Sequence, residues 1–189
     1  MGQPKLLLPW CGSTVIGQII SQWRELGAAQ IVIVLRAEDA PLAVELDRLH
    51  FPKANRIENP QPERGMFSSI GCAANWAGWQ KGIARWAIVL GDQPHLQMET
   101  LTRLAEFSTQ HAEAVCLPVH NGRVAHPVIL PRSSFAGLKA TRANTLKEYL
   151  MLTADEIIHQ RCVLNDSGLT LDMDTPEDYQ NLTMSPLSA

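Results

Sequence analysis

The sequence predicts an α/β fold whose sheet is mostly parallel and carries an antiparallel hairpin late in the chain. Up to residue 111, stretches with helical spacing of apolar residues alternate with short apolar runs. This alternation, with short connections, is typical of a parallel sheet that has helices on both faces. The apolar runs 114–119 and 124–130 then flank Asn121-Gly122, and an Asn-Gly pair between extended runs is a strong hairpin signal.

Composition and charge place the chain among ordinary globular proteins. With 189 residues, 46% of them hydrophobic, residues 1–189 are expected to form a single domain with a sizeable core. The net charge of -3 provides no basic field for binding nucleic acid. No apolar run is long enough to span a membrane. We therefore expect small molecules or proteins as partners, and neither nucleic acid nor membrane.

The cysteine pattern favours a cytoplasmic protein. The four cysteines are scattered and include no Cys-x-x-Cys pair, which argues against a structural metal site and a disulfide framework. No charged-then-apolar leader opens the chain. Reduced thiols in the cytoplasm are the simplest explanation.

Helices are predicted where apolar residues recur at helical spacing. Ser13 is expected to cap the first helix and Gly27 to end it. The predicted helices cover residues 15–26, 38–49, 67–79, 98–111 and 145–151, and a last one begins at Pro176.

Strands are predicted for the apolar runs between these helices. The run 31–35 is entirely aliphatic, which suits a strand buried on both faces of a parallel sheet. The other predicted strands are 56–58, 86–90, the hairpin pair, and 162–165, which is followed by the turn Asp166-Ser167-Gly168.

Asp92 follows the apolar run 86–90 directly after Gly91, and Pro94 prevents the strand from continuing. Ligands of open α/β sheets bind beyond the carboxyl ends of strands, so Asp92 is a candidate metal or substrate ligand. An Asp shortly before a Pro is also ordinary turn chemistry.

Two further carboxylates, Asp172 and Asp174, alternate just ahead of the last helix and should point the same way. Thr175 and Pro176 are explained as the start of that helix, but Asp172 and Asp174 are not. Carboxylates that face one way repel unless a cation lies beside them, and ligands that offer only oxygen suit Mg²⁺. With Asp92, they would hold a Mg²⁺ ion that bridges nucleotide phosphates.

Five ordered motifs resemble the MobA-like nucleotidyltransferases, and within them the branch that includes molybdenum cofactor cytidylyltransferase. The motifs are 1–10, 59–70, 90–94, 126–128 and 172–178. The resemblance implies a Rossmann-like three-layer α/β/α fold of the nucleotide-diphospho-sugar transferase type. It also implies a Mg²⁺-dependent reaction in which a CMP or GMP group passes from an NTP to a phosphorylated acceptor such as molybdopterin cofactor, with release of pyrophosphate. CTP is the NTP that the resemblance favours.

The resemblance also assigns the charged residues of the site. Lys5 would contact the triphosphate, although a lone lysine near an N-terminus is usually solvated. Asp92 would be the principal Mg²⁺ ligand and Asp174 the second acidic group at the metal, with Asp172 beside it.

The segment from Asn59 to Ser69 would line the nucleotide and acceptor pocket. Gly65 would permit close backbone approach, and Ser68 and Ser69 would offer hydroxyl and amide donors at a helix start. His126 would stand on the acceptor side. Ser68 and Ser69 are equally well explained as core-helix residues, and His126 as a strand histidine that bonds to a backbone carbonyl.

The sequence departs from the family pattern in two places. The apolar strand and the glycine-rich Leu-Ala-Ala-Gly-x-Ser-x-Arg loop expected before Met1-Gly2 are missing, so the domain is expected to be truncated at its N-terminus and to lack a strand in the middle of its sheet. Residues 140–144 replace a Gly-Asp-x-Gly-Ala-Arg-like loop that faces the acceptor. Two alternatives stay open: a non-catalytic nucleotide- or cofactor-binding chaperone for a molybdoenzyme, and a sugar-phosphate nucleotidyltransferase.

Overall fold

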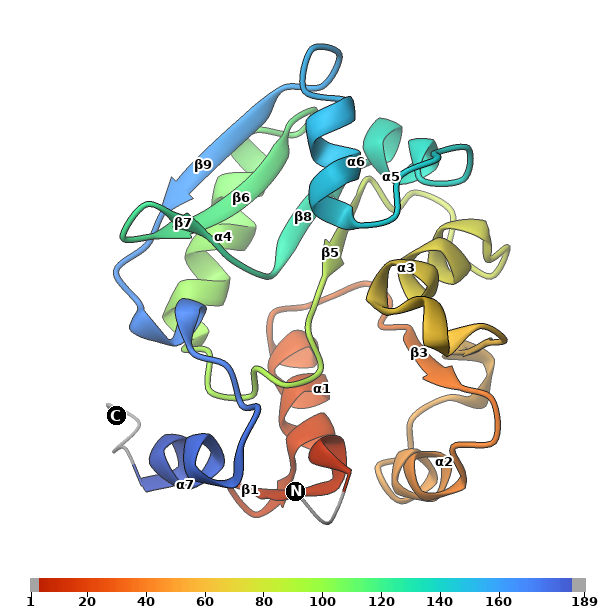
Figure 1. Cartoon of the computed structure of the whole chain (residues 1–189), viewed down its shortest axis with the longest axis vertical. Coiled ribbons are helices and arrows are strands. Elements are labelled where there is room, and N and C mark those ends of the chain that lie inside the picture. Colours follow the sequence, from red (N-terminus) through yellow and green to blue (C-terminus); the bar gives the residue numbers. More distant parts are fainter. Residues whose placement is uncertain (1–3, 185–189) are drawn as a thin grey trace.

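The structure, a computed structural model, describes residues 4–184 of the chain. Met1, Gly2 and Gln3, which belong to the first motif, lie outside the described residues. The chain has the predicted α/β fold, with a mixed, mostly parallel sheet and helices on both of its faces (Figure 1). No helix of the described residues is long and apolar enough to cross a membrane.

The larger sheet is built around β6 (Val115–His120) and β8 (Val128–Pro131). β8 pairs antiparallel with both β5 (Arg85–Ile88) and β6. β9 (His159–Val163) pairs parallel with β6. β5, β6 and β9 therefore run in one direction and β8 runs against them.

The predicted hairpin is confirmed, but its second strand, predicted as 124–130, is divided into two short strands. β6 turns back into the short strand β7 (Arg123–Val124). Asn121 and Gly122 form the turn with φ angles of 48° and 78°, the left-handed values that a two-residue hairpin turn requires.

Seven α-helices occur among the described residues, and most begin where the sequence predicts. They are α1 (Val15–Glu25), α2 (Ala40–Arg48), α3 (Met66–Asn75), α4 (Met98–Gln110), α5 (Arg132–Gly137), α6 (Leu146–Leu152) and α7 (Pro176–Met184). Short 3₁₀ turns are η1 (Lys5–Leu7), η2 (Lys53–Asn55), η3 (Pro62–Arg64) and η4 (Ser167–Thr170).

Some predicted boundaries are wrong. Thr14, not Ser13, caps α1, because its side chain accepts the bond from the Gly17 amide. Ser13 instead pairs in a small hairpin of β1 (Pro9–Trp10) and β2 (Ser13–Thr14). The strand predicted at 162–165 begins earlier, because β6 fixes the register of β9. The helix α5 was not predicted.

The helix α3 ends earlier than its apolar spacing predicts. The chain leaves the helix at Trp76, and Trp79 Nε1 donates to the Ala73 carbonyl at 2.8 Å. Trp79 then packs edge-on against Trp86 of β5 and Phe135 of α5. Packing of this large aromatic ring stabilises the chain here more than further turns of α3 would.

Successive residues of β6 point to opposite faces of the sheet, and each face has its own core. Val115 and Leu117 pack beneath α3, α5 and α6. Cys116 packs on the other face with the apolar side of α4. The result is the three-layer arrangement that the resemblance implied.

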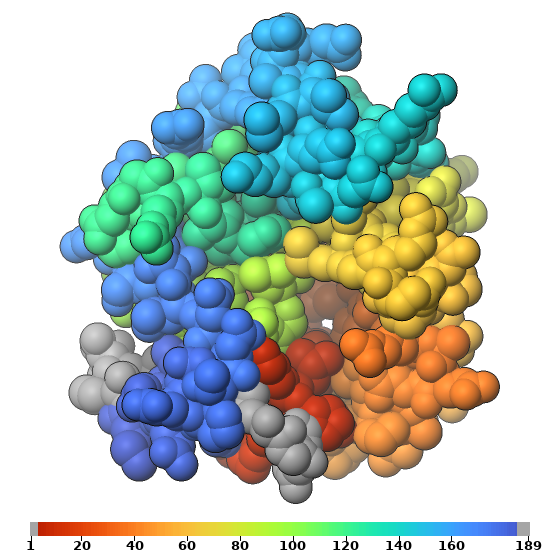
Figure 2. Space-filling model, in the orientation of Figure 1, coloured from red at the N-terminus to blue at the C-terminus, as the bar shows by residue number. Residues whose placement is uncertain are grey.

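The sheet is divided in its middle. β3 (Ile33–Arg36) and β4 (Arg56–Asn59) form a separate parallel pair, and among the described residues no ladder joins β3 to β5. The expectation that 31–35 is buried on both faces is wrong: only Leu35 is buried, and the other four residues are half-buried, because β3 has no second neighbour. Figure 2 shows a small opening in this region, between yellow, orange and red segments.

Candidate functional site

The loop after β5 carries Asp92 and is held firmly on its α1 side. Asp92 is half-buried. The buried Gln22 of α1 donates from Nε2 to the carbonyl oxygens of Pro94 at 3.1 Å and Leu96 at 2.8 Å. Because both bonds end on the loop backbone, they fix its path just beyond Asp92.

A buried polar network joins this loop to the segment that leads into α7. The Nε2 of His95 lies 3.0 Å from the carbonyl oxygen of Gly168. The carboxylate of Asp166 accepts hydrogen bonds from Thr100 Oγ1 at 2.7 Å and from the Gly168 amide at 2.8 Å. His95, Thr100 and Asp166 are all buried, and polar contacts shielded from water are electrostatically stronger.

Asp92 and Asp172 both lie within electrostatic reach of the His95 ring. Burial is the largest effect and lowers the pKa of His95 below its usual 6.5. The Gly168 carbonyl and the carboxylates of Asp166, Asp92 and Asp172 act in the opposite direction on the same pKa. The charges of Asp92 and Asp172 therefore act on the same imidazole.

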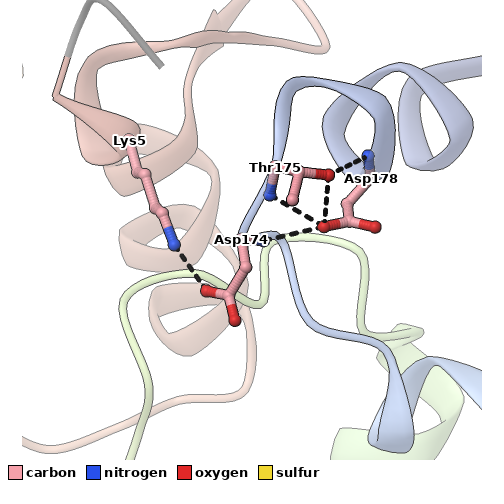
Figure 3. A network of polar contacts seen from close by, with 4 residues as sticks. All are labelled: Lys5, Asp174, Thr175 and Asp178. Carbon is pink, nitrogen blue, oxygen red and sulfur yellow. Dashed lines mark hydrogen bonds and ion pairs between the residues drawn. The ribbon is translucent and has the colours of Figure 1, made fainter.

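Lys5 and Asp174 form an ion pair (Figure 3). Lys5 Nζ lies 2.6 Å from Asp174 Oδ1, and the two side chains are 35% and 68% exposed. Lys5 is therefore not a free solvated lysine. The groups expected to bind the triphosphate and the metal neutralise each other.

The start of α7 holds Asp174 in place. The carboxylate of Asp178 accepts bonds from the backbone amides of Asp174 and Thr175 at 3.2 and 2.7 Å. Thr175 Oγ1 donates to Asp178 Oδ2 at 2.7 Å and accepts from the Asp178 amide at 3.1 Å. The Thr175 hydroxyl is the largest cause of the lowered pKa of Asp178. This reciprocal capping confirms Thr175 as the N-cap.

The N-terminal segment that carries Lys5 is anchored to the same region. Tyr179 of α7 donates from its hydroxyl to the carbonyl of Pro9 at 2.6 Å. The buried Trp10 ring lies between Tyr179, at 6.3 Å, and His95, at 6.5 Å between ring centroids. Three segments distant in the sequence therefore meet around His95.

The carboxylates of this region suit a hard divalent cation. Among residues 4–184, no three His, Cys, Asp or Glu side chains lie close enough together to hold a metal ion. Mg²⁺, however, commonly takes only one or two carboxylates together with substrate phosphates and water. Asp92, Asp172 and Asp174 offer oxygen ligands only, and all three retain exposed surface.

Asn59, expected in the substrate pocket, is structural in this arrangement. It is 1% exposed, and its Nδ2 donates to Ser68 Oγ at 2.8 Å and Ser69 Oγ at 3.0 Å. Its Oδ1 accepts from the Gln61 amide at 2.9 Å. Asn59 thereby ties the end of β4 to the first turn of α3, which satisfies its donors and acceptor within the protein.

The start of α3 keeps donors available. Gly65, with φ of 80°, precedes the helix, and no side chain caps it. Ser68 Oγ donates back to the Gly65 carbonyl at 2.7 Å, as a helix residue would. Among the described residues, the Ser69 hydroxyl hydrogen has no acceptor. The Gly65 amide donates to the Pro62 carbonyl at 3.1 Å, so Ser69 and the first amides of α3 itself are the parts of this segment that are open to a ligand.

His126 uses one of its ring nitrogens inside the protein. Its Nδ1 donates to the Ile88 carbonyl of β5 at 3.1 Å, and a cis peptide bond joins it to Pro127. Burial lowers the pKa of His126, and the nearby Asp92 charge partly opposes this. The alternative in which His126 bonds to a backbone carbonyl therefore accounts for Nδ1. Its Nε2 remains available to a ligand near Asp92.

The loop 140–144 is remote from this site. Ala140 and Thr141 line a cavity of about 610 Å³ with Glu113 and Ile158, which precede β6 and β9. Asp92 lies beyond the carboxyl end of β5, which runs in the same direction as β6 and β9. The loop therefore lies at the end of the sheet where β6 and β9 begin, opposite to the end at which Asp92 lies.

Comparison with known proteins identifies the family. The sequence profile of the MobA-like NTP transferase domain matches residues 1–157. The chain belongs to the MobA-like NTP transferase family. It is thus a nucleotidyltransferase, in agreement with the five motifs. No curated protein sequence matches it.

Solved structures share the fold of this MobA-like chain. Rv0371c from Mycobacterium tuberculosis H37Rv is 25% identical, with a TM-score of 0.75 over 98% of this chain and 91% of that one. A crystal structure of Rv0371c in complex with manganese is 26% identical, with a TM-score of 0.71 over 97% and 94%. Mth528, a nucleotidyl transferase from Methanothermobacter thermautotroptrophicus, has a TM-score of 0.76 at 18% identity, over 95% and 83%.

Sequence reasoning missed the buried network of this MobA-like transferase. The sequence suggested no role for His95 or Thr100, and it suggested Asp166 only as the first residue of a turn. A signal was present, because His95 directly follows the Gly91–Pro94 motif and Asp166 opens the Asp166-Ser167-Gly168 turn. That they meet depends on the fold.

Proposed function

We propose that this chain transfers a CMP or GMP group from an Mg²⁺-bound NTP to a phosphorylated acceptor such as molybdopterin cofactor, releasing pyrophosphate. The observation that supports this most is that Leu6, beside Lys5 and its partner Asp174 (Figure 3), packs against Gly91, beside Asp92 beyond the carboxyl end of β5. In α/β sheets this is the edge where ligands bind.

The charged groups of the chain match the needs of this reaction. Asp92 and Asp172 or Asp174 would hold the metal, and Lys5 would balance the negative charge of the triphosphate. Mg²⁺, when bound, neutralises the phosphates and aligns the α-phosphorus with the acceptor oxygen. The transfer requires no covalent protein nucleophile, so positioning and electrostatics are the main contributions of the protein.

Two uncharged features would orient the substrates. The uncapped start of α3 presents backbone amides and the Ser69 hydroxyl, which suits an anionic group. His126 Nε2 would contact the acceptor on the Asp92 side. The manganese complex of Rv0371c supports a divalent metal in a similar fold.

A reducing compartment suits the four cysteines. All of them are free thiols, and Cys11 is exposed. We therefore propose the cytoplasm as the place of the reaction.

A binding-only role is the second candidate. Two observations favour it: no group of three metal-ligating side chains is assembled within residues 4–184, and Asp174 is occupied by Lys5. In that case the chain would bind nucleotide or cofactor as a chaperone for a molybdoenzyme.

Pyrophosphate release with CTP or GTP, Mg²⁺ or Mn²⁺ and a molybdopterin acceptor tests the proposal. Asp92→Asn should reduce the rate by about 100-fold or more, since loss even of an outer-shell metal-site residue costs up to that amount. Asp155→Asn is the matched control, because it makes the same charge change at an exposed site after α6.

The outcomes separate the candidates. Turnover that depends on Asp92 and not on Asp155 supports the transferase. Nucleotide binding by calorimetry without pyrophosphate release supports the chaperone. An Asp92→Asn variant with unchanged Mg²⁺ affinity would contradict the assigned metal site.

A further inference from the structure

His95 contacts two of the other segments of the candidate site. Its ring bonds to Gly168, which lies between the buried Asp166 and the exposed Asp172. Its other neighbour is the ring of Trp10, in the N-terminal segment that also carries Lys5. His95 itself belongs to the loop that carries Asp92.

The hydrogen bond to Gly168 has a defined direction. A carbonyl oxygen only accepts, so His95 Nε2 carries the hydrogen and donates it. One side-chain bond therefore links the Asp92 loop to the backbone of the Asp172 segment. The bonds from Thr100 and the Gly168 amide to Asp166 hold the other end of the link.

The contact is also sterically tight. A Cβ atom at Gly168 would lie 2.9 Å from Asp166 Oδ1 and 3.2 Å from His95 Cδ2. The two segments are therefore packed so closely at this point that Gly168 leaves no room for a side chain.

Three buried polar atoms around the link have no hydrogen-bond partner among the described residues: His95 Nδ1, Gln93 Oε1 and Trp10 Nε1. Their side chains are 6%, 5% and 2% exposed. Unpartnered buried polar groups are costly, and each calls for an explanation such as a bound water, an ion or a catalytic role.

We propose that His95 is a positioning residue, which sets the separation of the Asp92 and Asp172 carboxylates and thereby the affinity of this site for its divalent metal. The inference rests on the proposed function for the identity of the metal site. Residues that orient metal ligands from outside typically contribute 10- to 100-fold to metal affinity.

The test compares three variants for Mn²⁺ binding, followed by electron paramagnetic resonance with and without CTP, and for thermal unfolding. His95→Leu keeps the volume and removes the donor, and His95→Gln restores an N–H donor at similar reach. Tyr149→Phe is the control, because it removes another buried bond to a backbone carbonyl, from Tyr149 to Ser134 at 2.6 Å, in the distant α5–α6 region.

His95→Leu should weaken Mn²⁺ binding by about 10- to 100-fold, and His95→Gln should recover most of that loss. Tyr149→Phe should lower the unfolding temperature and leave Mn²⁺ binding unchanged. Equal Mn²⁺ affinity in His95→Leu and Tyr149→Phe would overturn the proposal. If His95→Leu does not fold, Thr100→Val takes its place, because it removes one bond to Asp166. Its Mn²⁺ affinity is then compared with that of Tyr149→Phe in the same way.

The experiments distinguish a failure of the proposed function from a failure of the role proposed for His95. A wild-type chain that binds Mn²⁺ but releases no pyrophosphate with any NTP contradicts the transferase and leaves the role of His95 standing. A wild-type chain that is active, with variants of unchanged Mn²⁺ affinity, contradicts only the role of His95.

Discussion

Lys5 Nζ and Asp174 Oδ1 lie 2.6 Å apart, although 169 positions separate the two residues in the chain. The pair unites the cation expected at the triphosphate with a carboxylate expected at the metal. On the proposed function, Lys5 would pair with phosphate oxygens and Asp174 with the metal when a metal-bound nucleotide is present. Each charged group would exchange one partner of opposite charge for another, so neither would be left unpaired.

This exchange predicts that Lys5→Met and Asp174→Asn damage activity far more than stability. Both side chains are partly exposed, and such ion pairs contribute below about 1 kcal/mol to the free energy of unfolding. Pyrophosphate release should fall by about 100-fold in each variant, as expected for groups that act on transition-state charge.

The control for that comparison is Lys53→Met. It removes the same charge from an exposed ion pair, 3.7 Å from Asp47, on the β3–β4 side of the molecule. Its activity should equal that of the wild type. A Lys5→Met variant that is as active as Lys53→Met would remove Lys5 from the nucleotide site.

Three histidines with lowered pKa values predict a loss of stability in mild acid. Burial lowers the pKa of His95, His126 and His159 below the usual 6.5. Above 6.5 these side chains are neutral in both the folded and the unfolded chain. As the pH falls through 6.5, the unfolded chain binds protons that the folded chain does not, so the free energy of unfolding decreases until the folded-state pKa values are passed.

Urea unfolding at about pH 7.5 and about pH 5.5 measures this effect. The midpoint should be lower at the acidic pH, and His159→Gln should reduce the difference between the two. A midpoint that is constant over this interval would show that the three imidazoles titrate alike in the folded and unfolded chains.

The hydrogen bonds of Asn59 predict that its replacement strongly lowers the stability of the fold, although the sequence suggested this residue for substrate binding. Asn59→Ala removes the buried side chain that bonds to the Gln61 amide and to the half-buried Ser68 and Ser69 hydroxyls. We expect a loss of about 2 kcal/mol or more in the free energy of unfolding, since buried unsatisfied groups cost about 1–3 kcal/mol each.

Asn75→Ala is the matched comparison, because its amide donates to the Gly71 carbonyl on an exposed face of α3. It should cost less than about 0.5 kcal/mol beyond helix propensity. Equal costs for the two variants in urea unfolding would mean that Asn59 is not the structural tie between β4 and α3.

What the sequence predicted correctly depends on local signals. The apolar run before Gly91, the Asn121-Gly122 turn and the Thr175-Pro176 helix start act over a few residues, and each is found where predicted. The placement of Asp92 beyond β5 follows from the first of these.

What the sequence did not predict depends on contacts between distant segments. The bond from His95 to Gly168 and the bond from Thr100 to Asp166 join residues more than sixty positions apart. The early end of α3 results from packing of Trp79 on Trp86 and Phe135. Neither spacing nor propensity contains such information, because tertiary burial overrides both.

The division of the sheet predicts unequal protection of its strands against hydrogen exchange. Every residue of β6 is buried, and it has β8 on one side and β9 on the other. β3 has only β4 as a neighbour, and its residues are mostly half-buried. Strands with few buried contacts open locally at lower free energy than the core.

Peptides that cover residues 31–36 and 56–59 should therefore exchange amide hydrogens faster than peptides that cover 115–120 and 128–131. Mass spectrometry of exchange at neutral pH measures the difference. The helix α4 provides an internal reference, because its buried face packs on the same core as β6. If β3 and β4 were protected as strongly as β6, the two sheets would open together, and the missing ladder between β3 and β5 would have no consequence for local stability.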